Sequence, residues 1–167
     1  TDRYIGESAM ANYINDAIVE RSKHFVSGKV DFAFLNATGV NGLPVNQNIT
    51  LANMYQLFPY ADTLSVVEMT GREIRDIVEN NAKRIYRKED MKENGGTLDP
   101  ASFLERGFIH FSKGIRYAVK PGNAPEQNKV LSLTLNGENI DKVLDKKYKV
   151  AVGSYLAIGR GSWNGET

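Results

Sequence analysis

The sequence predicts a single α+β domain, in which helices pack on a mixed β-sheet. Three observations support this class. The 167 residues are enough for one domain, 1–167, with its own hydrophobic core. Apolar residues recur at helical spacing mainly in the first half of the chain, whereas segments of the last third alternate as strands do. Neither an internal repeat nor a clear linker divides the chain.

Three segments of the first half are expected to be helical. Residues 7–23 carry apolar side chains at helical spacing, and a shorter helix is expected over residues 51–58. The third helix is expected within residues 70–86. It begins with Thr70 and Glu73, which are spaced as a capping box, in which each side chain satisfies a backbone N–H.

Short apolar runs predict the strands. The expected strands cover residues 30–36, 63–69, 114–120, 129–137 and 148–157. The polar, Gly-rich stretch between Arg87 and Gly107 is expected to be a long surface excursion. A loop of that length in a compact domain is typically functional or mobile.

Composition excludes several classes of function. A net charge of +1 gives no electrostatic footprint for nucleic acid, and no apolar run is long enough to span a bilayer. The absence of cysteine excludes disulfides, thiolate nucleophiles and Cys-based zinc sites. His24 and His110 stand in no metal-ligand spacing, and structural roles are expected for both. We therefore predict no catalytic residue and no metal ligand in this chain.

Two tyrosines stand next to loops at the ends of predicted elements. Tyr60 lies in "FPYADT", between a helix and a strand, and Tyr155 lies in "GSYLAIGRG". Loops held by a rigid scaffold are favoured places for binding residues. Two interpretations remain open from the pattern alone: either the rings project over a cleft, or they complete the hydrophobic core.

The order and spacing of short motifs resemble the C-terminal domain of the 5′-nucleotidase family. Members of that family carry an Asn-Gly-Gly-Gly-Ile-Arg-like loop, then Gly-x-Ile-Thr, a helix, Pro-Phe-x-Asn, a strand and Thr-Gly-x-x-Leu. The counterparts here are "NATGVN", "QNIT", "FPYADT" and "MTGREI", and "YKVAVGSYLAIGRG" is similar to a closing strand. The resemblance covers nearly the whole chain. It is strongest to the bifunctional 2′,3′-cyclic-nucleotide 2′-phosphodiesterase/3′-nucleotidase branch.

The resemblance implies a role in nucleotide binding. Such enzymes have an N-terminal metallophosphatase domain with two divalent metal ions, which would lie upstream of this chain and be its partner. The C-terminal domain, with no cofactor of its own, stacks the base of a nucleotide or nucleoside between two aromatic rings, here Tyr60 and Tyr155. The family is usually extracytoplasmic. The other positions that match its substrate-binding residues are Asn36, Gly39, Asn41, Asp62 and Gly114.

The chain departs from the family pattern in the first loop. Asn41 stands where the family usually has Arg, and Ala37 and Thr38 replace two glycines. Loss of the Arg removes a charge that can reach phosphate or ribose, and Arg160 is a candidate replacement. These departures support the alternative function, a stand-alone binding or interaction module that kept the fold without the enzyme, whereas the nearly complete order of the motifs favours the substrate-binding domain of a nucleotide phosphohydrolase.

Overall fold

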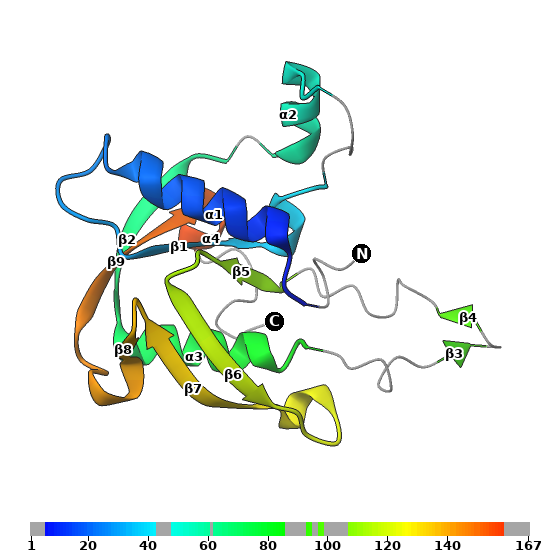
Figure 1. Ribbon diagram of the computed structural model, residues 1–167, viewed down its shortest axis with the longest axis vertical. Helices are drawn as coiled ribbons and strands as arrows, with labels where there is room; N and C mark the ends of the chain where they lie inside the picture. The colour runs from blue at the N-terminus through cyan, green and yellow to red at the C-terminus, as the bar shows by residue number, and fades with distance from the viewer. Residues whose placement is uncertain are drawn as a thin grey trace.

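The structure is a computed structural model that describes residues 6–42, 48–60, 62–85 and 107–158, and the backbone of 93–94 and 97–98. Its helices and strands confirm the α+β class (Figure 1). In chain order the elements are α1 (Ala9–Ser22), β1 (Phe32–Asn36), η2 (Ala37–Gly39), α2 (Leu51–Leu57), β2 (Leu64–Thr70), α3 (Gly71–Ala82), β3 (Glu93–Asn94), β4 (Thr97–Leu98), β5 (Ile109–Phe111), β6 (Ile115–Lys120), η5 (Pro125–Gln127), β7 (Lys129–Leu135), β8 (Glu138–Asn139), η6 (Ile140–Lys142), β9 (Lys147–Gly153) and α4 (Ser154–Ala157).

The main sheet is mixed and joins segments from both halves of the chain. Its four strands lie in the order β2-β9-β1-β5. β1 and β9 are parallel, with Phe34 opposite Val152, and the other two pairs are antiparallel. Because of these directions, the ends of β1 and β9 and the starts of β2 and β5 lie at the same end of the sheet. We call this end the C-terminal end of the sheet, after the direction of β1 and β9.

The two faces of the main sheet are covered differently. α1 packs on one face, and α3 packs with the three-stranded sheet β6-β7-β8 toward the other (Figure 1). Successive side chains of β1 alternate between these layers, as strand geometry requires. Phe32 and Phe34 enter the larger core cluster, whereas Ala33 packs on the α1 side.

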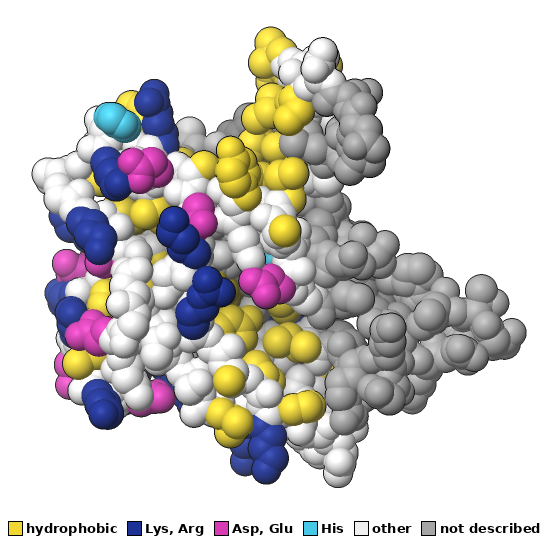
Figure 2. Space-filling model, in the orientation of Figure 1, with side chains coloured by type: hydrophobic (Ala, Val, Ile, Leu, Met, Phe, Trp, Pro, Cys, Tyr) yellow, Lys and Arg dark blue, Asp and Glu magenta, His cyan; other side chains and the backbone are white. Residues whose placement is uncertain are grey.

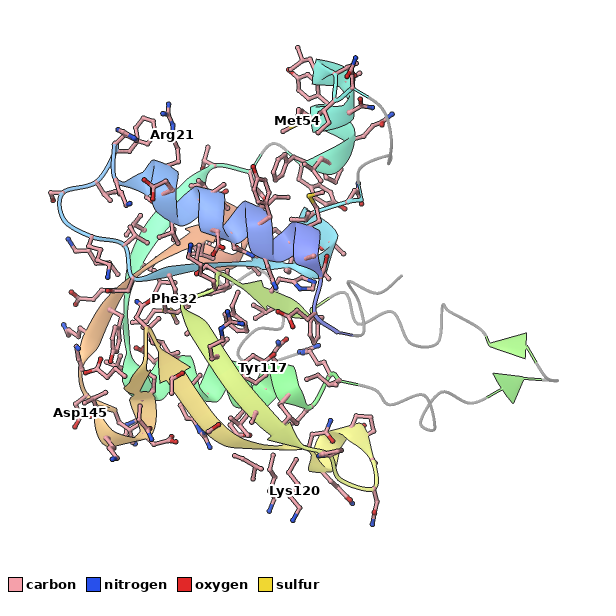
Figure 3. All side chains as sticks on the ribbon, in the orientation of Figure 1. Arg21, Phe32, Met54, Tyr117, Lys120 and Asp145 are labelled. Atoms are coloured by element: carbon pink, nitrogen blue, oxygen red, sulfur yellow. The ribbon has the colours of Figure 1, made fainter. Side chains whose placement is uncertain are left out.

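An aromatic cluster and a buried asparagine hold the larger core together. Phe32, which Figure 3 labels, has its ring centroid 6.2 Å from that of Phe34, and both rings approach Phe111. Asn81 of α3 is buried, and its side chain bonds both backbone groups of Ile109. Its Nδ2 donates to the Ile109 carbonyl at 2.9 Å, and its Oδ1 accepts from the Ile109 N–H at 2.7 Å. These bonds fix α3 against β5 at the sheet edge.

The expected capping box at the start of α3 is confirmed. Thr70 Oγ1 accepts from the Glu73 N–H at 3.3 Å, and Glu73 Oε2 accepts from the Thr70 N–H at 2.7 Å. The pKa of the Glu73 carboxyl is lowered because the Thr70 backbone N–H, and then its hydroxyl, donate to the charged form. α3 therefore begins at a fixed residue directly after β2.

The last predicted strand is wrong at its end. β9 ends at Gly153, and residues Ser154–Ala157 form the short helix α4 instead of continuing the strand to residue 157. The turn closes through a helical bond from the Ile158 N–H to the Ser154 carbonyl at 3.2 Å. The expected excursion from residue 87 to 107 lies largely outside the described residues, apart from the paired backbones of β3 and β4.

α2 lies away from the layered body (Figure 1). Of its residues only Leu57 is buried, and Leu51 and Tyr55 are each 72% exposed. Figure 2 shows hydrophobic side chains gathered over this helix, while basic and acidic side chains are interspersed over the rest of that face. Among the described residues, the face in view thus carries no region of a single charge sign.

Candidate functional site

The segments that carry the two tyrosines are bonded to each other at the C-terminal end of the sheet. The Ser154 N–H donates to the Thr63 carbonyl at 2.8 Å, and the Ser154 hydroxyl donates to Asp62 Oδ1 at 3.4 Å. Tyr60 precedes one side of this junction, and Tyr155 follows the other. Residues 95 apart in sequence are therefore held on neighbouring segments.

Neither tyrosine is a core residue. Tyr60 is 61% exposed and Tyr155 is 45% exposed. The interpretation in which both rings complete the core is wrong, because residues of the core are nearly inaccessible to solvent. Tyr60 lies before the start of β2 and Tyr155 after the end of β9, in connecting segments of the kind that often carry binding residues.

Asn36 and Gly39 lie together in a tight turn at the same end of the sheet. Asn36 Nδ2 donates to Thr38 Oγ1 at 2.6 Å. A Cβ on Gly39 would lie 3.1 Å from Asn36 Oδ1, so a larger residue there would press on the asparagine. The turn is tied to β5 because the Ala37 N–H donates to the Phe108 carbonyl at 2.7 Å. Residues 36–39 are thus held directly beside the end of β1.

Asn41 is engaged with α2. Its backbone N–H donates to the Leu57 carbonyl at 2.8 Å, and its Nδ2 donates to the Gln56 carbonyl at 2.8 Å. The last carbonyls of a helix have no partner within the helix, so these bonds satisfy two of them. Asn41 therefore positions the end of α2 at Leu57, which lies three residues before Tyr60. The sequence held no periodic signal for this contact.

Gly114 does not lie with the other candidate residues. It follows β5, at the opposite end of the sheet. Its carbonyl accepts from the Asn136 N–H at 2.8 Å, and a Cβ on it would lie 2.8 Å from Asn136 Oδ1. Asn136 Nδ2 in turn donates to the carbonyl of Asp31, which precedes β1, at 3.4 Å. A glycine is needed here for close approach of the turn after β7, which is a packing role.

The two histidines lie in different environments. His110 is 2% exposed, its ring packs edge-on against Phe108 with centroids 5.1 Å apart, and its carbonyl accepts from buried Asn15. His24 lies in the exposed turn after α1. Within the part of the chain that the structure describes, no three His, Asp or Glu side chains come together as a metal site would require. The described residues therefore do not fit a two-metal centre.

The structure contains a cavity that was not foreseen from the sequence. A cavity of 340 Å³ lies between the start of α1, β5 and β6, and Tyr117 is among its lining residues (Figure 3). Burial raises the pKa of the Tyr117 hydroxyl, whose oxygen accepts from Asn81 at 3.3 Å. Neither Tyr60 nor Tyr155 lines this cavity.

None of the helices among the described residues is long and apolar enough to cross a membrane.

Several known proteins are similar to this chain in sequence or in fold. The chain is 26% identical over 156 residues to the trifunctional nucleotide phosphoesterase protein YfkN of Bacillus subtilis, covering 92% of this chain and 9% of that protein. The 5′-nucleotidase precursor of Thermus thermophilus superimposes with a TM-score of 0.65 at 22% identity, covering 100% of this chain and 29% of that one. The NAD nucleotidase (NadN) of Haemophilus influenzae does so with a TM-score of 0.59 at 23% identity, covering 90% and 24%.

These likenesses to solved structures concern the fold, and the chain spans less than a third of each of these three proteins. A family model described as the C-terminal domain of 5′-nucleotidase matches residues 1–165. The predicted resemblance is therefore confirmed, and the chain belongs to the 5′-nucleotidase C-terminal domain family.

Proposed function

We propose that this chain binds the nucleoside part of a nucleotide and stacks its base between Tyr60 and Tyr155. One observation carries the proposal: the Ser154–Thr63 hydrogen bond holds two exposed tyrosines on neighbouring segments at one end of the sheet. Asn36, Gly39 and Asp62 belong to the same end. Gly114 is not part of the proposed site.

The chemistry of stacking suits these residues. Every nucleobase has a π-face, so two rings can hold a base with little dependence on its identity. A base stacked on an aromatic side chain contributes ~1–3 kcal/mol. A tyrosine presents a large apolar ring with few rotatable bonds, which keeps the entropic cost of ordering it low.

Hydrolysis would be carried out by another part of the enzyme. Two divalent metal ions in an upstream metallophosphatase domain would activate water for attack on phosphorus. The described residues of this chain would then bind and orient the nucleoside. The similarity to a nucleotide phosphoesterase supports a nucleotide substrate, and the similarity to a 5′-nucleotidase precursor supports an extracytoplasmic location.

One observation favours a second candidate, a non-catalytic binding module that kept the fold. Asn41, which stands at the family's Arg position, uses its amide on α2 and carries no charge toward a phosphate. A module that binds nucleosides would gain little from the phosphate group. A substrate-binding domain of a nucleotidase would bind AMP at least as tightly as adenosine.

Isothermal calorimetry with adenosine, AMP and 3′-AMP tests the proposal. We expect Tyr60→Ala to weaken adenosine binding by ~1–3 kcal/mol, because one stacked face is lost. Tyr60→Phe is the matched control and should retain most of the affinity, since it keeps the ring. The proposal fails if the wild-type chain binds none of the three ligands, or if Tyr60→Ala binds them as well as wild type does.

A further inference from the structure

We infer that the Asp62 carboxylate makes this site selective for bases that present two neighbouring hydrogen-bond donors, and for guanine above all. This inference rests on the proposed function, because it needs a base between Tyr60 and Tyr155. It goes further by assigning a class of base, which the stacking rings alone do not distinguish.

Asp62 lies at the junction between the segments that carry the two tyrosines. It lies two residues after Tyr60, and its side chain reaches the segment that carries Tyr155. Asp62 Oδ1 accepts from the Ser154 hydroxyl at 3.4 Å. Asp62 Oδ2 lies 3.9 Å from where a Cβ on Gly153 would stand. The carboxylate is thus held at the junction between the two ring-bearing segments, beside a residue without a side chain.

The Asp62 carboxylate has hydrogen-bond acceptor sites that no described residue occupies. Asp62 is exposed, and no Lys or Arg among the described residues forms an ion pair with it. A carboxylate offers about four lone-pair sites for hydrogen bonds. The Ser154 hydroxyl occupies one of them. The others remain available to a ligand held by the neighbouring rings.

A carboxylate distinguishes bases by the hydrogen-bond donors that they present. An ionised Asp accepts hydrogen bonds only. Guanine presents N1–H and the N2 amino group side by side, so both can donate to one carboxylate. Hypoxanthine keeps the N1–H but lacks the amino group. Adenine places the N1 lone pair beside its amino group, which sets an acceptor against the carboxylate. The expected order of affinity is therefore guanosine, then inosine, then adenosine.

Calorimetry with guanosine, inosine and adenosine tests this order. We expect guanosine to bind about tenfold more tightly than inosine, from the second hydrogen bond of a bidentate pair. Asp62→Asn replaces one acceptor by a donor, so it should bring the guanosine-to-inosine ratio close to one and improve adenosine binding. Asp145→Asn is the matched control, because Asp145 is an exposed Asp outside this junction, paired with Arg72. It should leave the ratio unchanged.

The possible failures are distinguishable. If the nucleosides bind and Tyr60→Ala weakens them, but Asp62→Asn leaves the guanosine-to-inosine ratio at its wild-type value, the inference about Asp62 is overturned and the proposed function stands. If none of the three nucleosides binds to the wild-type chain, the proposed function is overturned and the inference with it. Melting temperatures of all variants, measured in parallel, show that each variant is folded when it is assayed.

Discussion

The two ends of β9 place a tyrosine in opposite environments. Tyr148, near the start of the strand, is 4% exposed and belongs to the larger core cluster. Tyr155, just beyond the end, is 45% exposed. The same residue type therefore serves packing at one end of the sheet and remains accessible at the other. The difference shows that position relative to the strand end, and not residue type, separates a buried tyrosine from an accessible one here.

The partners of the two residues explain this difference. Tyr148 alternates with Lys149 along a paired strand, and its hydroxyl donates to Glu138 Oε2 at 2.9 Å. Tyr155 lies after the strand has ended, and the hydrogen bonds at this junction are made by its neighbour Ser154. The backbone beside Tyr155 is thus held at this junction, although the ring itself is not buried.

Tyr148→Ala should have the largest effect on stability. Truncating a buried aromatic residue leaves a cavity and costs about 3–5 kcal/mol. In a domain of this size that corresponds to a fall in melting temperature of roughly 10 °C or more. Chemical denaturation and calorimetry of the variant measure it. A change below about 1 kcal/mol would show that Tyr148 does not support the core, and the contrast between the two ends would disappear.

A smaller effect is expected from pH. Burial, and then the hydrogen bond to the Glu138 carboxylate, raise the pKa of the Tyr148 hydroxyl to about 12. The folded pKa lies above the ordinary value of about 10, so its stabilising contribution is complete below that pH and is lost as pH rises toward 12. Solvent near partly exposed Glu138 screens the interaction, and we expect a loss of about 1–2 kcal/mol.

Tyr148→Phe is the matched control for this pH dependence, since it keeps the ring and removes the titrating group. The variant should lose less stability than the wild type when unfolding is measured at a series of pH values between about 9 and 12. Parallel curves for the two proteins would contradict the assignment and point to other groups as the source of alkaline unfolding.

Local signals in the sequence predicted most elements but not the long-range pairing. The capping box of Thr70 and Glu73 is contained in four residues, so it was readable directly. The parallel pairing of β1 with β9 joins residues more than a hundred positions apart, and no local pattern encodes that register. Gly114 was expected near the site because of the family resemblance, and the sheet places it at the opposite end.

The candidate site was predictable only in part. Tyr60 and Tyr155 were identified from their motifs, but the strand expected through residue 157 would have carried Tyr155 into the sheet. The strand ends because Ser154–Ala157 turn into α4, although the Ser154 N–H still pairs with the Thr63 carbonyl, about ninety residues away. The tether from Asn41 to the end of α2 was missed because an isolated Asn in a loop gives no periodic signal. Local motifs could be predicted from the sequence, whereas contacts between residues far apart in the chain could not.

Tyr155→Ala should have the smallest effect on stability. Substitutions at exposed positions usually change the free energy of unfolding by less than about 0.5 kcal/mol, because little packing is lost. The same substitution should weaken nucleoside binding by ~1–3 kcal/mol if the ring stacks on a base. Both quantities must be measured on the same preparation, by thermal unfolding and by calorimetry with a nucleoside. A melting temperature that falls as far as that of Tyr148→Ala would mean that Tyr155 supports the fold. Lost binding with an unchanged melting temperature would instead assign the start of β9 to stability and the region beyond its end to recognition, because only the exposed ring would then contribute to the complex.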